Sequence, residues 1–560
     1  MNPLSSFHRS EIAQRLKTEV FDLIIIGGGI TGAGIALDAA SRGMKVALLE
    51  KSDFAAGTSS KSTKLIHGGL RYLKQMELAL VREVGTERAT VHRMAPHLVT
   101  PEKMLLPLIK GGTYGSFSTS IGLWLYDVLA NVKGDDRRKM LNKQQTLDKE
   151  PLLAKESLTG GGYYAEYRTD DARLTIETLK TATQFGATIL NYAHVENLLY
   201  TDHIIGVRCK DVPTGEVFDI EGLSVVNAAG PWVDDLRSAD QSLFGKHLFL
   251  SKGIHIVVPR ERLPIKQAAY FDAPDGRMIF AIPRHRATYI GTTDTPYKGK
   301  PDEVRVLRED VNYLLDAVNN MFPKAALKAG DVESSWAGLR PLIYEEGKSA
   351  SEMSRKDEVF ESPSGLISIA GGKLTGFRKM AERVVNIVAG RLKAEHGKQF
   401  MAAFSDKIPL RGGYFRDAAE VVRYREELSK RVVAIGLPAW RADYLTANYG
   451  RQSDAILEQL SAYDDAPETA LACAEAWFAI HQEMALTPLD FFERRTGRLY
   501  FDLPNIAPVQ EAVLAVFAQY FDWAPSVLRQ KRQSLEEAVF EASCAFLDQQ
   551  EPLFANAINK

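Results

Sequence analysis

The clearest hydrophobic pattern near the start of the chain is a short buried strand followed by a helix with a small-residue face. Residues 23–26 are all apolar, which is typical of a strand covered on both sides. A glycine cluster then opens a helical pattern whose packing side consists of alanines, Ala33, Ala36, Ala39 and Ala40. Gly43 ends that pattern, and residues 45–50 supply a second strand. Residues 20–50 therefore predict a βαβ unit.

Two later segments have the pattern of further strands in the same sheet. Residues 223–232, "LSVVNAAGPW", form an apolar strand that runs into small residues, and residues 365–385 show a strand, a glycine pair and an amphipathic helix. Between them lie the runs "HIVVP", "RMIFAIP" and "ATYIGTTDT", which stop at Pro, Gly or Asp as strands of an antiparallel sheet do. The pattern predicts a split α/β domain with a second sheet inserted into it.

The hydrophobic pattern changes beyond residue 400, where amphipathic helical patterns dominate. Examples are "QEAVLAVFAQYF" and "SLEEAVFEASCAFL". Ser534 and Glu537 have the spacing of a capping box, which predicts that a helix begins at Ser534. No cluster of chemically active residue types stands out in this tail, so we expect it to serve packing or interaction.

Composition and charge exclude several classes of protein. The 560 residues are 45% hydrophobic and 25% charged, values of a globular protein with two to four domains. A formal net charge of −2 gives no sign of nucleic-acid binding. The three cysteines are far apart in sequence, and the histidines lie in no cluster of ligand spacing, so we expect neither a disulfide framework nor a metal site.

The chain shows no targeting or membrane-spanning pattern. Its first twenty residues lack the apolar core of a signal peptide, and no later stretch has eighteen uncharged apolar residues in a row. We therefore expect a cytoplasmic protein that is neither exported nor inserted across a membrane.

The glycine cluster has the spacing of a dinucleotide-binding turn. Gly27, Gly29 and Gly32 occupy the G-x-G-x-x-G positions, where the turn is tight and the backbone approaches a pyrophosphate at a helix N-terminus. Glu50 follows roughly eighteen residues later, at the end of the second strand, where it can accept hydrogen bonds from a ribose. A lone glycine triplet is only a tight turn, but the strand, helix and acid together predict dinucleotide binding.

The chain beyond Glu50 favours a flavin dinucleotide over NAD. An NAD domain continues directly into further βα repeats, whereas this chain enters the polar loop "GTSSKSTKLIHGGLRYL" at residues 57–73. Flavin folds commonly split their sheet in this way, because the long cofactor runs from the first βαβ unit to a site built late in the chain. FAD is the expected cofactor.

The motifs together resemble one family, the FAD-dependent glycerol-3-phosphate dehydrogenases, which are aerobic flavoenzymes that pass electrons to quinone. The matching segments run in family order from about residue 20 to 385: "GGGITGAGIALDAASRG", "SSKSTKLIHGGLRYL", "DDARL", "NAAGPWV", "KGIHIVVP", "IGTTDTPYKG", "GLRPL" and "GGKLTGFRKMAE". The tail resembles the helical C-terminal domain of the same family more loosely.

The patterns and the resemblance together set the expected architecture, a split Rossmann-type FAD-binding domain with an inserted antiparallel-sheet substrate domain and a helical C-terminal domain. We expect the FAD-binding domain to comprise residues 20–90, 160–248 and 331–395. The inserted substrate domain would comprise residues 91–159 and 249–330, and the helical domain residues 400–560.

The resemblance also implies an activity, the oxidation of sn-glycerol 3-phosphate to dihydroxyacetone phosphate by hydride transfer to FAD, with a membrane quinone as final acceptor. A quinone lies in the bilayer, so the expected location is the inner face of the cell membrane, with peripheral contact. The stretch "FSTSIGLWLYDVLANVKGDDRRKMLNK" is one candidate contact, since apolar residues at helical spacing precede a basic end; a core-facing helix is the alternative. Whether the chain forms a homo-oligomer stays open.

Candidate cofactor contacts lie in two glycine-rich segments. In the loop at 57–73, Thr58, Ser59 and Ser60 are placed to meet the pyrophosphate and the flavin ring. In the late segment "GGKLTG" the expected contacts are Gly371, Gly372 and Thr375.

A phosphorylated alcohol needs cations for its dianion and a base for its hydroxyl proton. The candidate cations are Arg71, Arg340 and Lys373, each beside glycine or proline in an apolar context, and Tyr72 could add a hydroxyl contact. For each cation a structural salt bridge is the alternative role. His67 is the first candidate for the base and His255 the second, although a histidine on an apolar strand is more often a core residue.

Three other activities fit the same patterns. One is an oxygen-using glycerol-3-phosphate oxidase of the same fold, which the short distance between "GLRPL" and "GGKLTG" disfavours because that branch usually carries a long insertion there. Another is an amine or amino-acid oxidase of the wider superfamily, which would need a carboxylate clamp in place of a phosphate site. The third is a non-enzymatic flavoprotein that senses redox state.

Overall fold

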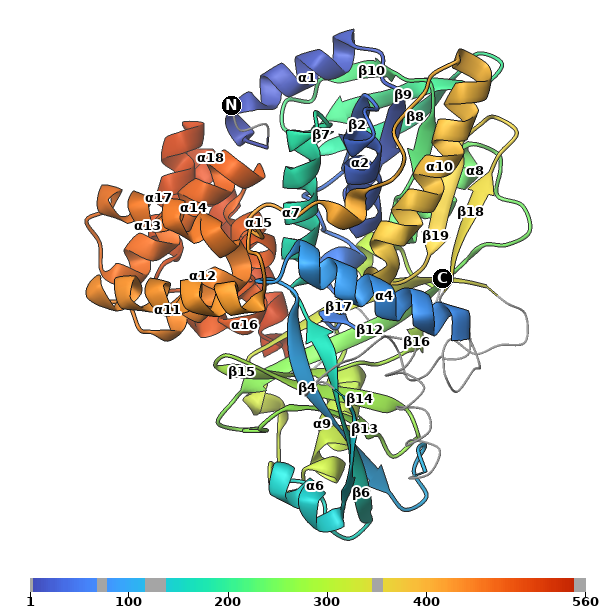
Figure 1. The fold of residues 1–560 in the computed structure, drawn as a ribbon. Coiled ribbons are helices and arrows are strands. Elements are labelled where there is room, and N and C mark those ends of the chain that lie inside the picture. Colours follow the sequence, from blue (N-terminus) through green and yellow to red (C-terminus); the bar gives the residue numbers. More distant parts are fainter. Residues whose placement is uncertain (1–3, 68–77, 116–136, 345–355, 548–560) are drawn as a thin grey trace, which may run out of the picture.

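The computed structural model describes residues 4–67, 78–115, 137–344 and 356–547 (Figure 1). Some expectations from the sequence lie outside these ranges. They are the substrate contacts assigned to Arg71 and Tyr72, and the apolar part of the candidate membrane helix, which falls within residues 117–136. Most of the basic end of that stretch is described, and its residues Lys139–Asn142 form a strand.

A mixed sheet, mostly parallel, carries the glycine-rich turn. Its strands come from distant parts of the chain because each parallel pair needs a crossover connection. In order across the sheet they are β18 (Asp357–Glu361), β19 (Ile367–Gly371), β11 (Val225–Asn227), β1 (Leu23–Ile26), β2 (Val46–Leu49) and β7 (Thr188–Leu190). β18 pairs antiparallel with β19, and the other neighbours are parallel. β1, β2, β7 and β11 are buried throughout, as the uniformly apolar pattern of residues 23–26 predicted for β1.

Three helices accompany this sheet, and one of them, α2, contacts the other two (Figure 1). They are α2 (Ile30–Ser41), α7 (Asp171–Gln184) and α10 (Phe377–His396). The alanine face of α2 is buried as expected. A Cβ atom on Gly34 would lie 2.9 Å from the ring of Phe377, so the approach of α2 to α10 depends on a residue without a side chain.

A small antiparallel sheet lies beyond the mixed sheet, near α1 (Arg9–Thr18). It contains β8 (Ala193–Tyr200), β9 (Ile204–Asp211) and β10 (Val217–Glu221). Their burial alternates along much of each strand, which leaves one face of this sheet in solvent.

A larger sheet, antiparallel apart from one parallel pair, forms the lower part of the molecule in Figure 1. Along its main path it runs through β16 (Thr295–Pro296), β12 (Leu248–Pro259), β15 (Ala287–Gly291), β14 (Met278–Arg284), β13 (Ala268–Asp272), β4 (Thr100–Ile109), β6 (Leu158–Arg168) and β3 (Leu65–Ile66). β17 (Ser334–Ile343) joins β12, and β5 (Lys139–Asn142) joins β6. The strands expected from "HIVVP", "RMIFAIP" and "ATYIGTTDT" are all present.

Three strands within the ranges expected for the FAD-binding domain pair in this larger sheet. β3 hydrogen-bonds to β6, β6 to β4 along most of its length, and β17 to β12. A hydrophobic pattern along the chain can predict strands but carries no information about which sheet each strand enters. The helices α4 (Leu78–Met94), α6 (Lys143–Lys149) and α9 (Arg308–Met321) contact this sheet, whereas α8 (Val233–Ala239) packs against β19 of the mixed sheet.

The C-terminal part is helical and gathers on one side of the molecule, drawn in orange to red in Figure 1. Its helices are α11 (Ala418–Ala434), α12 (Trp440–Tyr449), α13 (Ser453–Gln459), α14 (Pro467–Glu483), α15 (Pro488–Asp490), α16 (Arg498–Phe501), α17 (Gln510–Phe521) and α18 (Pro525–Ala542). A π-helical turn, Phe491–Arg495, lies between α15 and α16. The predicted α/β class with a split sheet, an inserted sheet and a helical C-terminal part is confirmed.

One predicted boundary in the tail is wrong. Ser534 lies inside α18, where its hydroxyl donates to the carbonyl oxygen of Gln530, and the helix begins at Pro525. Serine and glutamate three residues apart occur in helix interiors as well as at caps, and Pro525 is the stronger start signal.

Candidate functional site

A cavity of about 1850 Å³ opens at the carboxyl ends of the parallel strands. Its wall includes Ile26, Leu49 and Gly371, which are the last residues of β1, β2 and β19 respectively. Ala228, just after β11, also belongs to the wall. Ligands of open α/β sheets bind at this edge, because the loops that follow the strands converge there.

The glycine turn is built for close backbone contact. Gly27 has φ +115°, and a Cβ atom there would lie 2.5 Å from the carbonyl oxygen of Ala228. A Cβ atom on Gly32 would lie 1.9 Å from the carbonyl oxygen of Gly27. Gly29 is the N-cap of α2 and borders the cavity with Ile30 and Thr31, so the positive end of the helix dipole faces the cavity. The turn therefore offers a binding site for an anion.

Glu50, the predicted ribose contact, lines the cavity directly after β2. Its two carboxylate oxygens accept the backbone N–H groups of Gly28 at 2.7 Å and Ser52 at 2.9 Å. Burial raises the pKa of Glu50, and these two N–H donors partly offset that rise. The carboxylate is thus held in place against the glycine turn.

The hydroxyl loop, defined here as residues 57–61, closes over the start of α2. Ser59 Oγ accepts the backbone N–H of Ile30 at 2.9 Å, and Thr58 Oγ1 donates to the carbonyl oxygen of Leu339 at 2.7 Å. Both residues line the cavity, whereas Ser60 is buried and lies outside the cavity wall as the structure describes it. Two of the three expected hydroxyl residues therefore reach the cavity.

The late glycine segment reaches the same cavity from β19. Gly371 and Gly372 have φ of +78° and +82°, and both line the wall with Lys373. Thr375 is buried behind the wall, where its hydroxyl donates to the carbonyl oxygen of His67 at 3.3 Å. This bond connects the late segment to the chain that follows the hydroxyl loop.

Arg340 lies on β17 between two cavity residues, Leu339 and Pro341. Its guanidinium donates to Thr292 Oγ1 at 2.8 Å and to the carbonyl oxygen of Thr293 at 3.1 Å, and it pairs with Asp294 at 3.3 Å. The side chain is 21% exposed. Arg340 is thus a fixed, partly accessible cation, although it is not part of the cavity wall among the described residues.

The two candidate bases have different surroundings. His255 is buried on β12, stacks on Trp336 with ring centroids 4.7 Å apart, and shares a 3.0 Å hydrogen bond between Nε2 and Thr63 Oγ1. Burial holds the pKa of His255 well below its usual range, with Arg340 adding repulsion. His67 is half-buried, and its ring lies 6.0 Å from that of Phe280. Neither ring belongs to the wall of the cavity within the described chain.

These residues fit FAD. The helix N-terminus suits its pyrophosphate, Glu50 suits its adenosine ribose, and the cavity continues from there to the late glycine segment, as a long cofactor requires.

The comparisons with known proteins agree with this fit. Residues 22–378 match the family model described as FAD dependent oxidoreductase, and residues 404–527 match the C-terminal domain of alpha-glycerophosphate oxidase. The aerobic glycerol-3-phosphate dehydrogenase of Bacillus subtilis is 51% identical over 543 residues, which cover 96% of this chain and 98% of the relative. The chain belongs to the FAD-dependent glycerol-3-phosphate dehydrogenase family.

Two further comparisons cover nearly the whole chain. The aerobic glycerol-3-phosphate dehydrogenase of Staphylococcus aureus strain USA300 is 48% identical over 96% of this chain and 98% of its own length. The glycerol-3-phosphate dehydrogenase from Bacillus halodurans, solved in complex with FAD, superposes with a TM-score of 0.83 at 44% identity, covering 98% of this chain and 99% of that one. The predicted family, enzyme class and FAD cofactor are confirmed.

The cavity of this family member also has a wall that the sequence did not predict. Leu489, Glu493, Leu499 and Tyr500 of the helical C-terminal part line it, as does Lys61 from the hydroxyl loop. We expected no such role for the tail. The run "FFERRTGRLYF" mixes charges with aromatic residues, a pattern of buried ion pairs that could have drawn attention to it.

The described residues contain neither a membrane-spanning helix nor a cluster of metal ligands. No helix there is long and apolar enough to cross a membrane. No group of three or more His, Cys, Asp and Glu side chains in the described ranges is arranged to hold a metal ion.

Proposed function

We propose that this protein oxidises sn-glycerol 3-phosphate to dihydroxyacetone phosphate and passes the electrons to a membrane quinone. The near full-length similarity to proteins named aerobic glycerol-3-phosphate dehydrogenase carries this proposal. FAD, when bound, accepts the hydride from the alcohol carbon.

Arg340 and Lys373 would bind the phosphate of the substrate. Lys373 stands on the cavity wall, directly after the glycine pair of β19. Arg340 is oriented by Thr292, Thr293 and Asp294, and an oriented guanidinium recognises a phosphate with two parallel hydrogen bonds. Arg71 and Tyr72, outside the described residues, complete the proposed set.

His67 would take the hydroxyl proton. It follows the hydroxyl loop along the chain, and the hydrogen bond from Thr375 to its carbonyl oxygen fixes its backbone beside the late glycine segment. His255 is the second candidate because its Nε2 already shares a hydrogen bond with Thr63.

Anaerobic addition of glycerol 3-phosphate to the FAD-loaded protein tests the substrate. We expect loss of the flavin absorbance near about 450 nm, with glycerol and simple amino acids as control compounds. Bleaching by an amino acid and not by the phosphate would contradict the proposal.

The oxygen-using oxidase is the second candidate, and the match of residues 404–527 to the C-terminal domain of alpha-glycerophosphate oxidase favours it. Turnover with a quinone analogue and hydrogen peroxide formation in air separate the two. We expect quinone reduction to be much faster; the opposite order identifies an oxidase.

Peripheral association with the inner face of the membrane follows from the proposed acceptor. We expect co-sedimentation with anionic liposomes at low salt, and a larger effect of lipid on turnover with quinone than on turnover with a soluble dye. Lipid-independent quinone turnover without liposome binding would place the protein in the cytosol.

A further inference from the structure

The helical C-terminal part reaches the hydroxyl loop through one side chain, Lys61. The Lys61 ammonium pairs with the Glu493 carboxylate and with the hydroxyl of Tyr500, and it lies 4.8 Å from the centre of the Tyr500 ring. Tyr500 in turn donates to Glu493 at 2.6 Å. All three residues line the cavity that fits FAD.

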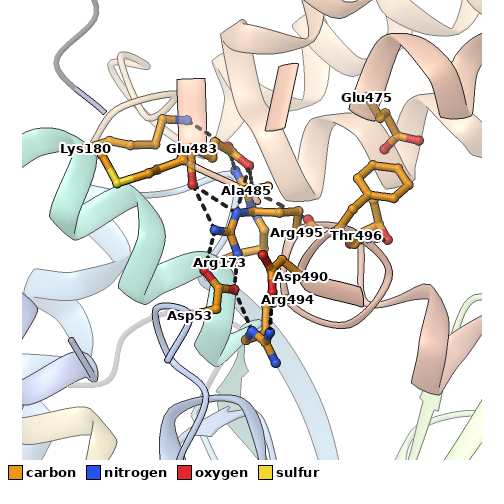
Figure 2. Close-up of polar contacts among 12 residues, drawn as sticks. Asp53, Arg173, Lys180, Glu475, Glu483, Ala485, Asp490, Arg494, Arg495 and Thr496 are labelled. Atoms are coloured by element: carbon orange, nitrogen blue, oxygen red, sulfur yellow. Dashed lines mark hydrogen bonds and ion pairs between the residues drawn. The ribbon is translucent and has the colours of Figure 1, made fainter. Parts of the chain in front are cut away.

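A second connection joins the chain just before the hydroxyl loop to the same helical segment, behind the cavity wall. Asp53, three residues after Glu50, accepts Arg495 Nη1 at 2.7 Å and Nη2 at 2.8 Å, and Arg494 Nε at 2.6 Å. Arg494 also donates to Asp490 at 2.9 Å. Asp53 and Arg495 are fully buried, and Figure 2 shows Asp53 facing the two arginines of the π-helical turn.

Opposite charges balance across this contact. Lys61, Arg494 and Arg495 are the cations, and Asp53, Asp490 and Glu493 are the anions. Burial alone would raise the pKa of Glu493, but Arg494 and Lys61 bring it down to about 2. A buried ion that loses its partner destabilises the folded state strongly, so each side of the contact depends on the other.

Thr58 and Ser59 border the cavity two or three residues before Lys61, on the same short 3₁₀ turn. The position of Lys61 therefore determines where these hydroxyls lie. Lys61 itself has no freedom to move without leaving Glu493 and Tyr500, which sit on a different part of the fold.

We propose that Glu493 and Tyr500 are positioning residues of the FAD site, which hold the hydroxyl loop through Lys61, so that FAD binding and the docking of residues 488–502 are thermodynamically linked. Linkage is reciprocal: the cofactor stabilises the docked segment, and a docked segment raises the affinity for the cofactor. The C-terminal part then belongs to the cofactor site as well as to the packing of the molecule.

Glu493→Gln tests the proposal, and Glu150→Gln is a control. Glu150 is also a buried carboxylate, and it accepts the backbone N–H of Lys266 at 2.9 Å and the side-chain amide of Gln267 at 3.1 Å. It lies at the end of α6, and among the described residues it neither binds residues 488–502 nor lines the cavity. The measured quantity is the Kd of the full-length apoprotein for FAD, from the quenching of flavin fluorescence, beside the thermal midpoint of each variant.

We expect Glu493→Gln to raise the Kd for FAD at least tenfold, while Glu150→Gln lowers the thermal midpoint with a change in Kd of less than threefold. An unchanged Kd in Glu493→Gln, or an equal rise in both variants, overturns the proposal, because the effect would then be absent or a general loss of stability.

Hydrogen exchange of the unmodified protein gives a second measurement that does not depend on a variant folding. We expect FAD to slow amide exchange in residues 488–502 severalfold relative to the apoprotein, with no change in α11, which lies elsewhere in the helical part. Equal exchange of residues 488–502 with and without FAD overturns the linkage.

Discussion

Gly32 lies directly against the carbonyl group of Gly27: a Cβ atom on Gly32 would come within 1.9 Å of that oxygen. Carbon and oxygen atoms in contact need more than 3 Å, and both partners here are backbone, which cannot rotate away. The first turn of α2 and the end of β1 can therefore approach each other only when residue 32 has no side chain.

Gly32→Ala should yield a protein with little or no bound FAD, because the added methyl group must displace the turn that faces the pyrophosphate. The ratio of absorbance near about 450 nm to that at about 280 nm measures occupancy. Gly390→Ala is the control: Gly390 is exposed on α10 with open space around it, and the change should stabilise the protein by about 0.5–1 kcal/mol at full flavin content. Full occupancy in Gly32→Ala would remove the motif from the cofactor site.

Arg340→Ala should raise the KM for glycerol 3-phosphate roughly 10- to 100-fold and leave FAD bound, since a charge-assisted contact to a dianion is lost. Arg262→Ala removes an arginine whose ion pair with Asp331 lies at the surface, and it should leave KM unchanged. A lower thermal midpoint in Arg340→Ala with an unchanged KM would mean that Arg340 has only a structural role, through its contacts with Thr292, Thr293 and Asp294.

His67→Asn should lower kcat by roughly 100- to 10,000-fold with FAD retained, because the proposed base is removed. His255→Asn should lower kcat less than tenfold but reduce the thermal midpoint, since the stacking on Trp336 and the bond to Thr63 are lost. Steady-state rates and thermal scans of both variants decide the assignment. The reverse order of the two kcat values would make His255 the base.

The local parts of the site could be predicted from the sequence, and the distant contacts could not. Gly27, Gly29 and Glu50 lie within one βαβ unit, where spacing along the chain fixes spacing in the molecule. The ion pairs of Asp53 with Arg494 and Arg495 depend on the contact of two segments that are remote in the sequence. The sequence around a charged residue does not indicate which remote residue it will pair with. Dinucleotide binding could be predicted because its motif is local, and FAD followed from the polar loop after Glu50 and the split sheet. The role of Glu493 could not be predicted.

Acid should destabilise the protein through its buried histidines. Burial lowers the pKa of His97 to about 3, with Arg173 and Lys180 adding repulsion, whereas the unfolded chain binds that proton near pH 6.5. The unfolded state then holds more protons between these values, so stability falls as the pH falls below 6.5. Wild-type protein should lose about 1 kcal/mol more than His97→Gln between pH 6 and 5, measured by urea unfolding. Equal losses would mean that His97 titrates alike in both states.

Asp53 and Arg495 are 442 residues apart in the sequence, yet they form a fully buried ion pair. Protein synthesis proceeds at about 5–20 residues per second, so a nascent chain carries Asp53 for roughly 20–90 s before its arginine partner exists. During that time the βαβ unit can form its local turn, but the chain segment around Asp53 cannot reach its final buried state. Completion of the cofactor site therefore waits until the segment that carries Arg494 and Arg495 has been synthesised.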